Sequence, residues 1–175
     1  VTRPVVVAEH LILGGELLAP VVDGSADLWL TPPAAVRLAP LSYLGRPDGD
    51  PRAWPGQALD RWSRVGSNTP ARVAAVMDVE PGVIRIDGPH VSAAVSWVGL
   101  SHALLWEELA QSAEPPWNRS VIALGVEPTS AAHGLGTALP EGTISLAAGD
   151  SLTWSVELSV EWLRRDFMPE QQEEQ

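Results

Sequence analysis

The chain has 175 residues, 45% of them hydrophobic and 19% charged, which suits one globular domain able to bury a substantial core. Its formal net charge is −11, with 11 arginines and no lysine, so its surface would repel phosphate backbones and no nucleic-acid partner is expected. The absence of cysteine excludes disulfides, thiol catalysis and cysteine-ligated metals.

Nothing in the sequence predicts export or membrane insertion. No apolar run approaches the roughly 20 residues that cross a bilayer. The first residues, VTRPVVVAEH, lack the long apolar core and small-residue cleavage site of a signal peptide. We therefore expect a cytoplasmic protein that binds no membrane.

The predicted elements are short strands, because 16 prolines and 15 glycines divide the chain into short segments. Residues 39–71 are rich in Pro, Gly and Asp, which predicts a long loop, either functional or a linker between domains. Before this loop, strands are predicted over residues 4–9 and 34–38. After it, strands are predicted over residues 72–79, 83–87, 91–98 and 120–127.

The last predicted strand has the clearest pattern. In SLTWSVELSVEWL (151–163), apolar and polar residues alternate from Leu152 to Trp162, so one face should be buried, including Trp154 and Trp162. The preceding AAGD predicts a turn, and therefore a hairpin with a strand over 143–148. The acidic tail 166–175 is predicted to be disordered, which leaves 1–165 as a single domain.

One segment has two interpretations. In LSHALLWEELAQSAE (100–114), Leu100, Ala103, Leu104 and Leu109 have helical spacing, and Ala, Leu and Glu favour a helix. The apolar run LLW could equally extend a strand that ends in a loop.

Glu127 is the first candidate for chemistry, because it ends the apolar run VIALGV and precedes Pro128. Proline disfavours helix at the residue before it, so Glu127 should be extended and its carboxylate should have a defined direction. A strand-end carboxylate that faces water is the ordinary alternative. His10 likewise follows an apolar strand, and is either a hydrogen-bonded strand-end residue or part of a site.

Other candidates have equally ordinary alternatives. His102 could belong to the core or to a site, and Glu107 with Glu108 could simply form a solvated face. The eight tryptophans exceed the one Tyr and one Phe, and an indole near a loop can stack on a sugar ring. No two histidines have the spacing of a zinc site, so no metal is expected.

Several motifs together resemble the galactose mutarotase-like (aldose 1-epimerase) family. They are VVVAEHLILGGELLAP, then LLWEE, PPW and VIALGVEPTSAAHGLG, and finally LAAGDSLTWSVELSV, in order over about 4–163. The resemblance implies an all-β fold, a twisted antiparallel β-sandwich with a sugar cleft across one sheet. It also favours a strand at 103–107.

The same resemblance implies that Glu127 is the general base and His10 the general acid of a reaction that interconverts sugar anomers without a cofactor. A carboxylate and an imidazole can hold opposite protonation states near neutral pH, as such a pair requires. Roughly 5–8 Å between the two groups would leave room for a pyranose. The residues expected to contact the sugar are Trp54, Trp106, Trp117, Glu107 and His102.

The chain departs from that family in length. Family members are typically nearly twice as long, and only their C-terminal half has a counterpart here. We therefore expect either a mutarotase-like enzyme, or part of one, or a non-catalytic sugar-binding or assembly module. Open sheet edges in a truncated sandwich could be covered by a homo-oligomer partner or by the missing N-terminal half.

Overall fold

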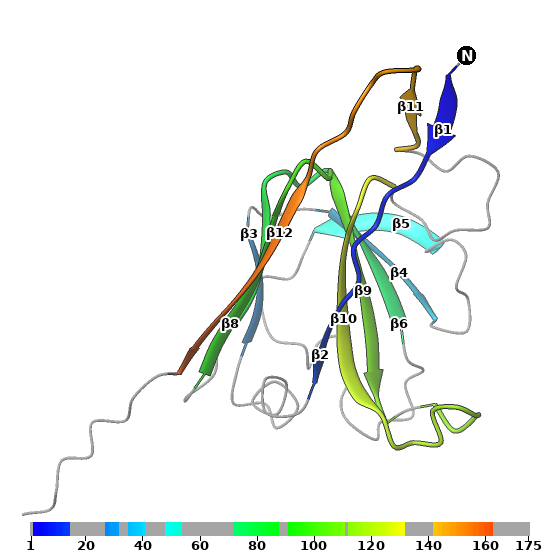
Figure 1. Cartoon of the computed structure of the whole chain (residues 1–175). Helices are drawn as coiled ribbons and strands as arrows, with labels where there is room; N and C mark the ends of the chain where they lie inside the picture. The colour runs from blue at the N-terminus through cyan, green and yellow to red at the C-terminus, as the bar shows by residue number, and fades with distance from the viewer. Residues whose placement is uncertain are drawn as a thin grey trace, which may run out of the picture.

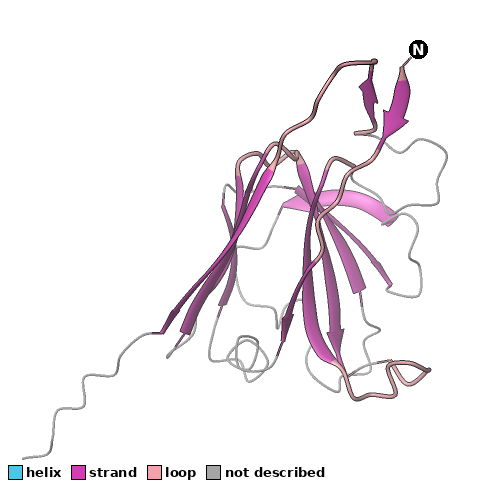
Figure 2. Cartoon of the chain, viewed as in Figure 1, coloured by secondary structure: helices cyan, strands magenta, loops and turns pink. Residues whose placement is uncertain are grey.

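The computed structural model describes residues 2–14, 27–31, 35–40, 48–53, 72–87, 91–110, 112–131 and 142–162. These residues contain strands and no helix, so the predicted all-β class is confirmed (Figure 2). In chain order the strands are β1 (Arg3–Val5), β2 (Leu11–Gly14), β3 (Asp27–Thr31), β4 (Ala35–Pro40), β5 (Asp48–Ala53), β6 (Arg72–Met77), β7 (Gly82–Asp87), β8 (Val91–Val98), β9 (His102–Leu109), β10 (Ile122–Thr129), β11 (Ile144–Leu146) and β12 (Ser155–Trp162).

Two antiparallel sheets form the body of the molecule. The larger has six strands in the order β2-β10-β9-β6-β4-β5, and the smaller has four in the order β12-β8-β7-β3. Figure 1 shows the two sheets facing each other, with the short pair β1 and β11 beyond one end. We call the face of each sheet that is turned toward the other its inner face.

The core lies between the inner faces. It combines Leu105 and Leu124 of the six-stranded sheet with Ile84, Val95 and Trp97 of the four-stranded sheet. These side chains are almost wholly removed from water, which is the main favourable term in folding. In β7 and β8 the sequence achieves this by placing buried residues at every second position.

The outer faces of the two sheets differ. In β8 buried residues alternate with half-buried ones, so its outer face is partly solvated. In β10 the residues from Ala123 to Val126 are all buried, so this strand is covered on both faces. A second small apolar cluster, Ala75, Met77 and Leu104, lies on the same outer face of the six-stranded sheet.

The predicted C-terminal hairpin is wrong. β11 pairs with β1, and β12 pairs with β8 over its full eight residues. The AAGD turn does form, because the Asp150 carboxylate accepts from the amide of Ala147 at 2.8 Å. However, the next strand begins only at Ser155, so the turn does not fix the pairing.

The other strand predictions fare unevenly. β4, β6, β7, β8 and β10 confirm five of them, and β9 resolves the ambiguous segment as a strand. The strand expected over 4–9 ends at Val5, and β5 lies within the expected long loop. Trp162, expected in the core, is 62% exposed. The tail 166–175 lies outside the described residues.

Candidate functional site

Glu127 lies on the outer face of the six-stranded sheet. Its neighbours in β10, Leu124 and Val126, face the core, and strand alternation turns Gly125 and Glu127 the other way. The Glu127 side chain is 14% exposed, so most of it is screened from water while part remains accessible. The prediction of an extended residue before Pro128 is confirmed, because both belong to β10.

His10 contacts Glu127 directly. The amide of Glu9 donates to the carbonyl of Pro128 at 2.9 Å, which holds the chain before β2 alongside the end of β10. His10 Nδ1 then lies 3.1 Å from Glu127 Oε1, and its side chain is 63% exposed. The expected separation of 5–8 Å is therefore wrong, since the backbone contact brings the two residues together more closely.

Trp106 lies next to this pair. It is the register partner of Gly125, across the β9–β10 ladder. A Cβ on Gly125 would lie 3.2 Å from the Trp106 ring and 3.4 Å from Glu127 Oε1, so glycine permits the close approach of ring and carboxylate. The sequence carries a signal for this close approach, because an isolated glycine inside an apolar strand often marks a place where other groups come near the backbone.

Trp117 extends the aromatic surface from Trp106. The two ring centroids lie 5.1 Å apart with a tilt of 53°. Trp117 sits in a compact loop after β9, in which the Trp117 amide donates to the carbonyl of Glu114 at 2.9 Å. The structure thus brings together four of the predicted site residues: His10, Glu127, Trp106 and Trp117.

Two further predicted residues do not join them. Glu107 is buried on the inner face, since it shares that face with Leu105 and pairs in register with Leu124. His102 is buried, and its Nδ1 accepts from the amide of Asp78 at 3.1 Å, which fixes the turn after β6. Trp54 lies outside the described residues.

Two other acidic residues, Glu108 and Glu9, have defined contacts. The alternative that Glu107 and Glu108 form a solvated face is wrong, because both are fully buried. Glu108 is buried on the same face as Glu127, and its Oε1 accepts from the amide of Ser112 at 3.1 Å. Glu9 is directed toward Trp154, and its Oε1 accepts from Trp154 Nε1 at 2.9 Å. The pattern AEH, with two adjacent polar residues after an apolar strand, was the available signal for Glu9.

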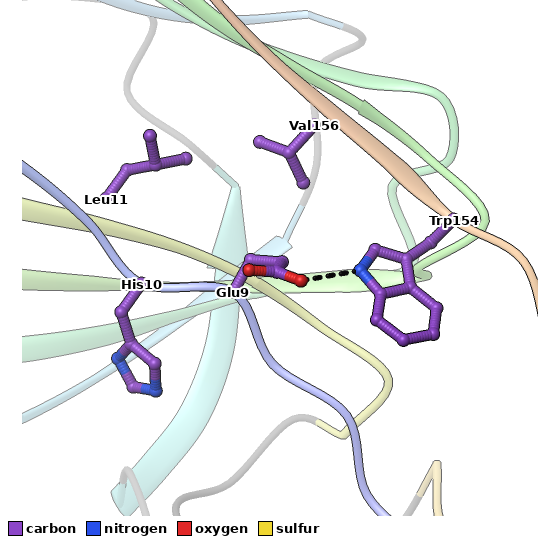
Figure 3. A pocket seen from close by; sticks show the side chains of 5 residues that line it. All are labelled: Glu9, His10, Leu11, Trp154 and Val156. Atoms are coloured by element: carbon purple, nitrogen blue, oxygen red, sulfur yellow. Dashed lines mark hydrogen bonds between the residues drawn. The ribbon is translucent and has the colours of Figure 1, made fainter.

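Glu9 and Trp154 line a groove of about 360 Å³ with His10, Leu11 and Val156 (Figure 3). This groove lies between β2 and β12, which are terminal strands of the two sheets. Figure 3 shows the His10 ring directed away from the Glu9–Trp154 hydrogen bond, so the side chains of the adjacent residues Glu9 and His10 point in different directions.

Within the described residues, no three His, Asp or Glu side chains are grouped so as to hold a metal ion. The same part of the chain contains no helix long and apolar enough to span a membrane.

Comparison with known proteins adds no family to these observations. No protein-family model matches the chain. No curated protein and no solved structure matches it either.

Proposed function

We propose that this protein binds a sugar over the outer face of the six-stranded sheet and interconverts its anomers, with Glu127 as base and His10 as acid. The observation that supports this proposal is the contact of 3.1 Å between an imidazole and a largely screened carboxylate, beside a pair of half-buried tryptophans. A cytoplasmic location belongs to the same proposal.

The reaction needs only two proton transfers and no cofactor. The Glu127 carboxylate takes the proton of the anomeric hydroxyl while the bond from C1 to the ring oxygen breaks. The electron pair of that bond goes to the ring oxygen, which takes a proton from the protonated His10. Rotation about C1–C2 and the reverse steps close the ring as the other anomer and restore both residues. Positioned acid–base groups contribute on the order of 10² to 10⁴ in rate.

The different burial of the two residues suits these roles. Glu127 is held by β10 and screened by its neighbours, so its direction is fixed. His10 is largely exposed, so its side chain can rotate away from Glu127 and admit a sugar between them. Trp106 and Trp117 would then stack on the apolar side of the ring.

Polarimetry of freshly dissolved α-glucose and α-galactose tests the catalytic role. We expect wild-type protein to accelerate mutarotation, and Glu127→Gln to lower kcat/KM by about 10² to 10⁴ without loss of folding. Glu114→Gln, which alters an exposed carboxylate in a loop, is the matched control and should keep the wild-type rate. Mutarotation at the uncatalysed rate with wild-type protein would refute the proposal.

A second candidate function is a sugar-binding module without catalysis. In this alternative the 3.1 Å contact between Nδ1 of His10 and Oε1 of Glu127 persists when the sugar binds, so neither atom exchanges a proton with it. Sugar-dependent shifts in the NMR signals of the Trp106 and Trp117 indoles, without any acceleration of mutarotation, would support this module. Loss of those shifts in Trp117→Ala would locate the sugar on the same face.

A further inference from the structure

The strand β12 is an open edge of the four-stranded sheet. All eight of its residues pair with β8, and in the described part of the chain no strand pairs with its other side. An unpaired edge presents a row of free backbone donors and acceptors to any extended chain. β12 contains no proline, and its pairing with β8 has a continuous register without a bulge, so two common means of blocking such an edge are absent.

The inner face of β12 is apolar and largely uncovered. Val156 packs against the core, but Leu158, Val160 and Trp162 are 43%, 41% and 62% exposed. Their register partners on β8 are the buried residues Val95, Ala93 and Val91. The apolar layer of the core therefore continues onto β12, where it is exposed to solvent. We call Leu158, Val160 and Trp162 the apolar row.

Acidic groups lie close to the apolar row, on the other face of β12 and at its start. Glu157 and Glu161 are exposed on the opposite face of β12. At the start of β12, the Glu9 carboxylate and the Trp154 indole line the groove together with the apolar side chains of Leu11 and Val156. A carboxylate next to an aromatic ring attracts a cation, and the apolar wall suits the methylenes of Lys or Arg.

We propose that the β12 edge binds an extended segment of a partner protein in which apolar residues alternate with Lys or Arg. The segment adds a strand to β12 through its backbone, and its apolar side chains cover Leu158, Val160 and Trp162. Its basic side chains on the other face meet Glu157 and Glu161, and a basic residue at one end enters the groove beside Glu9.

The charges favour such a partner over a second copy of this chain. Two copies would each carry a net charge of −11, and antiparallel pairing centred on Ser159 would set Glu157 against Glu161. Like charges directly opposite each other in a sheet destabilise the pair.

The probe is the acetylated and amidated peptide VKVSVKVSR, which would place valines along the apolar row, lysines opposite the two glutamates and arginine in the groove. Its binding to ¹⁵N-labelled protein would be followed by NMR. We expect saturable shifts of β12 amides. The same residues reordered as VVVVKSKSR, and the acidic analogue VEVSVEVSE, should bind at least about tenfold more weakly, since strand addition needs the alternation and the charge.

Two pairs of variants locate the binding. Leu158→Lys should weaken binding of VKVSVKVSR at least about tenfold because it sets a charge on the apolar row, while Ile122→Lys, at a residue of β10 that is 41% exposed, should not. Glu161→Lys should weaken binding about two- to fivefold and improve that of the acidic analogue, while Glu114→Lys leaves both unchanged. Circular dichroism checks that each variant is folded.

The groove has a separate test. Replacing the terminal arginine of the peptide by alanine should weaken binding to wild-type protein, but should have little further effect in Glu9→Gln, since both changes remove the same contact. The proposal is overturned if the peptide does not bind, or if Leu158→Lys and Ile122→Lys have equal effects. Sedimentation showing a dimer that Leu158→Lys dissociates would also overturn it, because a second copy would then occupy the edge.

Discussion

The outer faces of the two sheets are built differently, although both sheets contribute to the same core. On β8 of the four-stranded sheet, Ser92 and Ser96 are half-buried between buried neighbours, as in a sheet with one wet face. On the six-stranded sheet, the outer face buries Ala123, Leu104 and Glu108. A polar group on such a face is screened from water and held by defined contacts, so the covered face is where a carboxylate can be aimed for chemistry.

The strongest test of this difference places the same charge on both faces. Ala123→Asp puts a carboxylate on the covered face, opposite the buried Glu108, and should destabilise the protein by about 3–5 kcal/mol. Ala94→Asp puts it on the wet face, opposite Arg85, and should change stability by less than about 1 kcal/mol. Urea denaturation measures both. Equal effects would show that the two outer faces do not differ.

A smaller effect is expected from the glycine that accommodates Trp106. Gly125→Ala places a Cβ 3.1 Å from the Trp106 Cβ, so the tryptophan must shift, at a cost of about 1–2 kcal/mol. Under the proposed function, the shift should also weaken sugar binding. Gly14→Ala on the neighbouring strand is the control, because its Cβ meets only a carbonyl at 3.5 Å. If the two variants unfold at the same urea concentration, the close packing at Gly125 does not contribute to the stability of the protein.

The smallest effect concerns a carboxylate on the wet face. Partial burial raises the pKa of Asp87, but hydrogen bonds from Arg85 at 2.6 Å and Ser92 at 2.8 Å outweigh it, so this pKa lies below its ordinary value. The resulting stability is present above the unfolded pKa of about 3.9 and is lost as the pH falls through the lower folded pKa.

Asp87→Asn removes this contribution at neutral pH. The difference in unfolding free energy between wild type and Asp87→Asn should therefore be larger at pH 7 than at pH 2.5, and 1 M salt should reduce it because both partners are partly exposed. Urea titrations at the two pH values provide the measurement. A difference that grows on acidification would contradict the direction of the pKa shift.

The sequence predicted those strands whose own pattern determines them. The alternation in 91–98 and the apolar run at 120–127 are local signals, and β8 and β10 confirm them. β5 (DGDPRA) was missed because Gly, Asp and Pro disfavour strands, yet Pro51 is tolerated there since β5 ends its sheet. The pairing of β11 with β1 and of β12 with β8 depends on contacts far along the chain, which a turn motif does not specify.

The contact between His10 and Glu127 could be predicted only in part, for the same reason. Glu127 could be chosen from its own neighbours, but its contact with His10 depends on a backbone bond between Glu9 and Pro128. Trp106 and Glu107 could not share one face of a site in a strand, because adjacent strand residues point to opposite faces. The strand favoured over 103–107 already separates them.

Hydrogen bonds at Val7 and Glu9, rather than a continuous ladder, hold the segment that carries His10. The Val7 carbonyl accepts from the Ser130 amide at 2.9 Å, the Glu9 amide donates to Pro128, and Ala8, Glu9 and His10 are exposed. Such a segment can detach by local opening while the long ladder between β9 and β10 stays closed. His10 and Glu127 therefore belong to parts of the chain with different local stability, and the segment before β2 limits the lifetime of their contact.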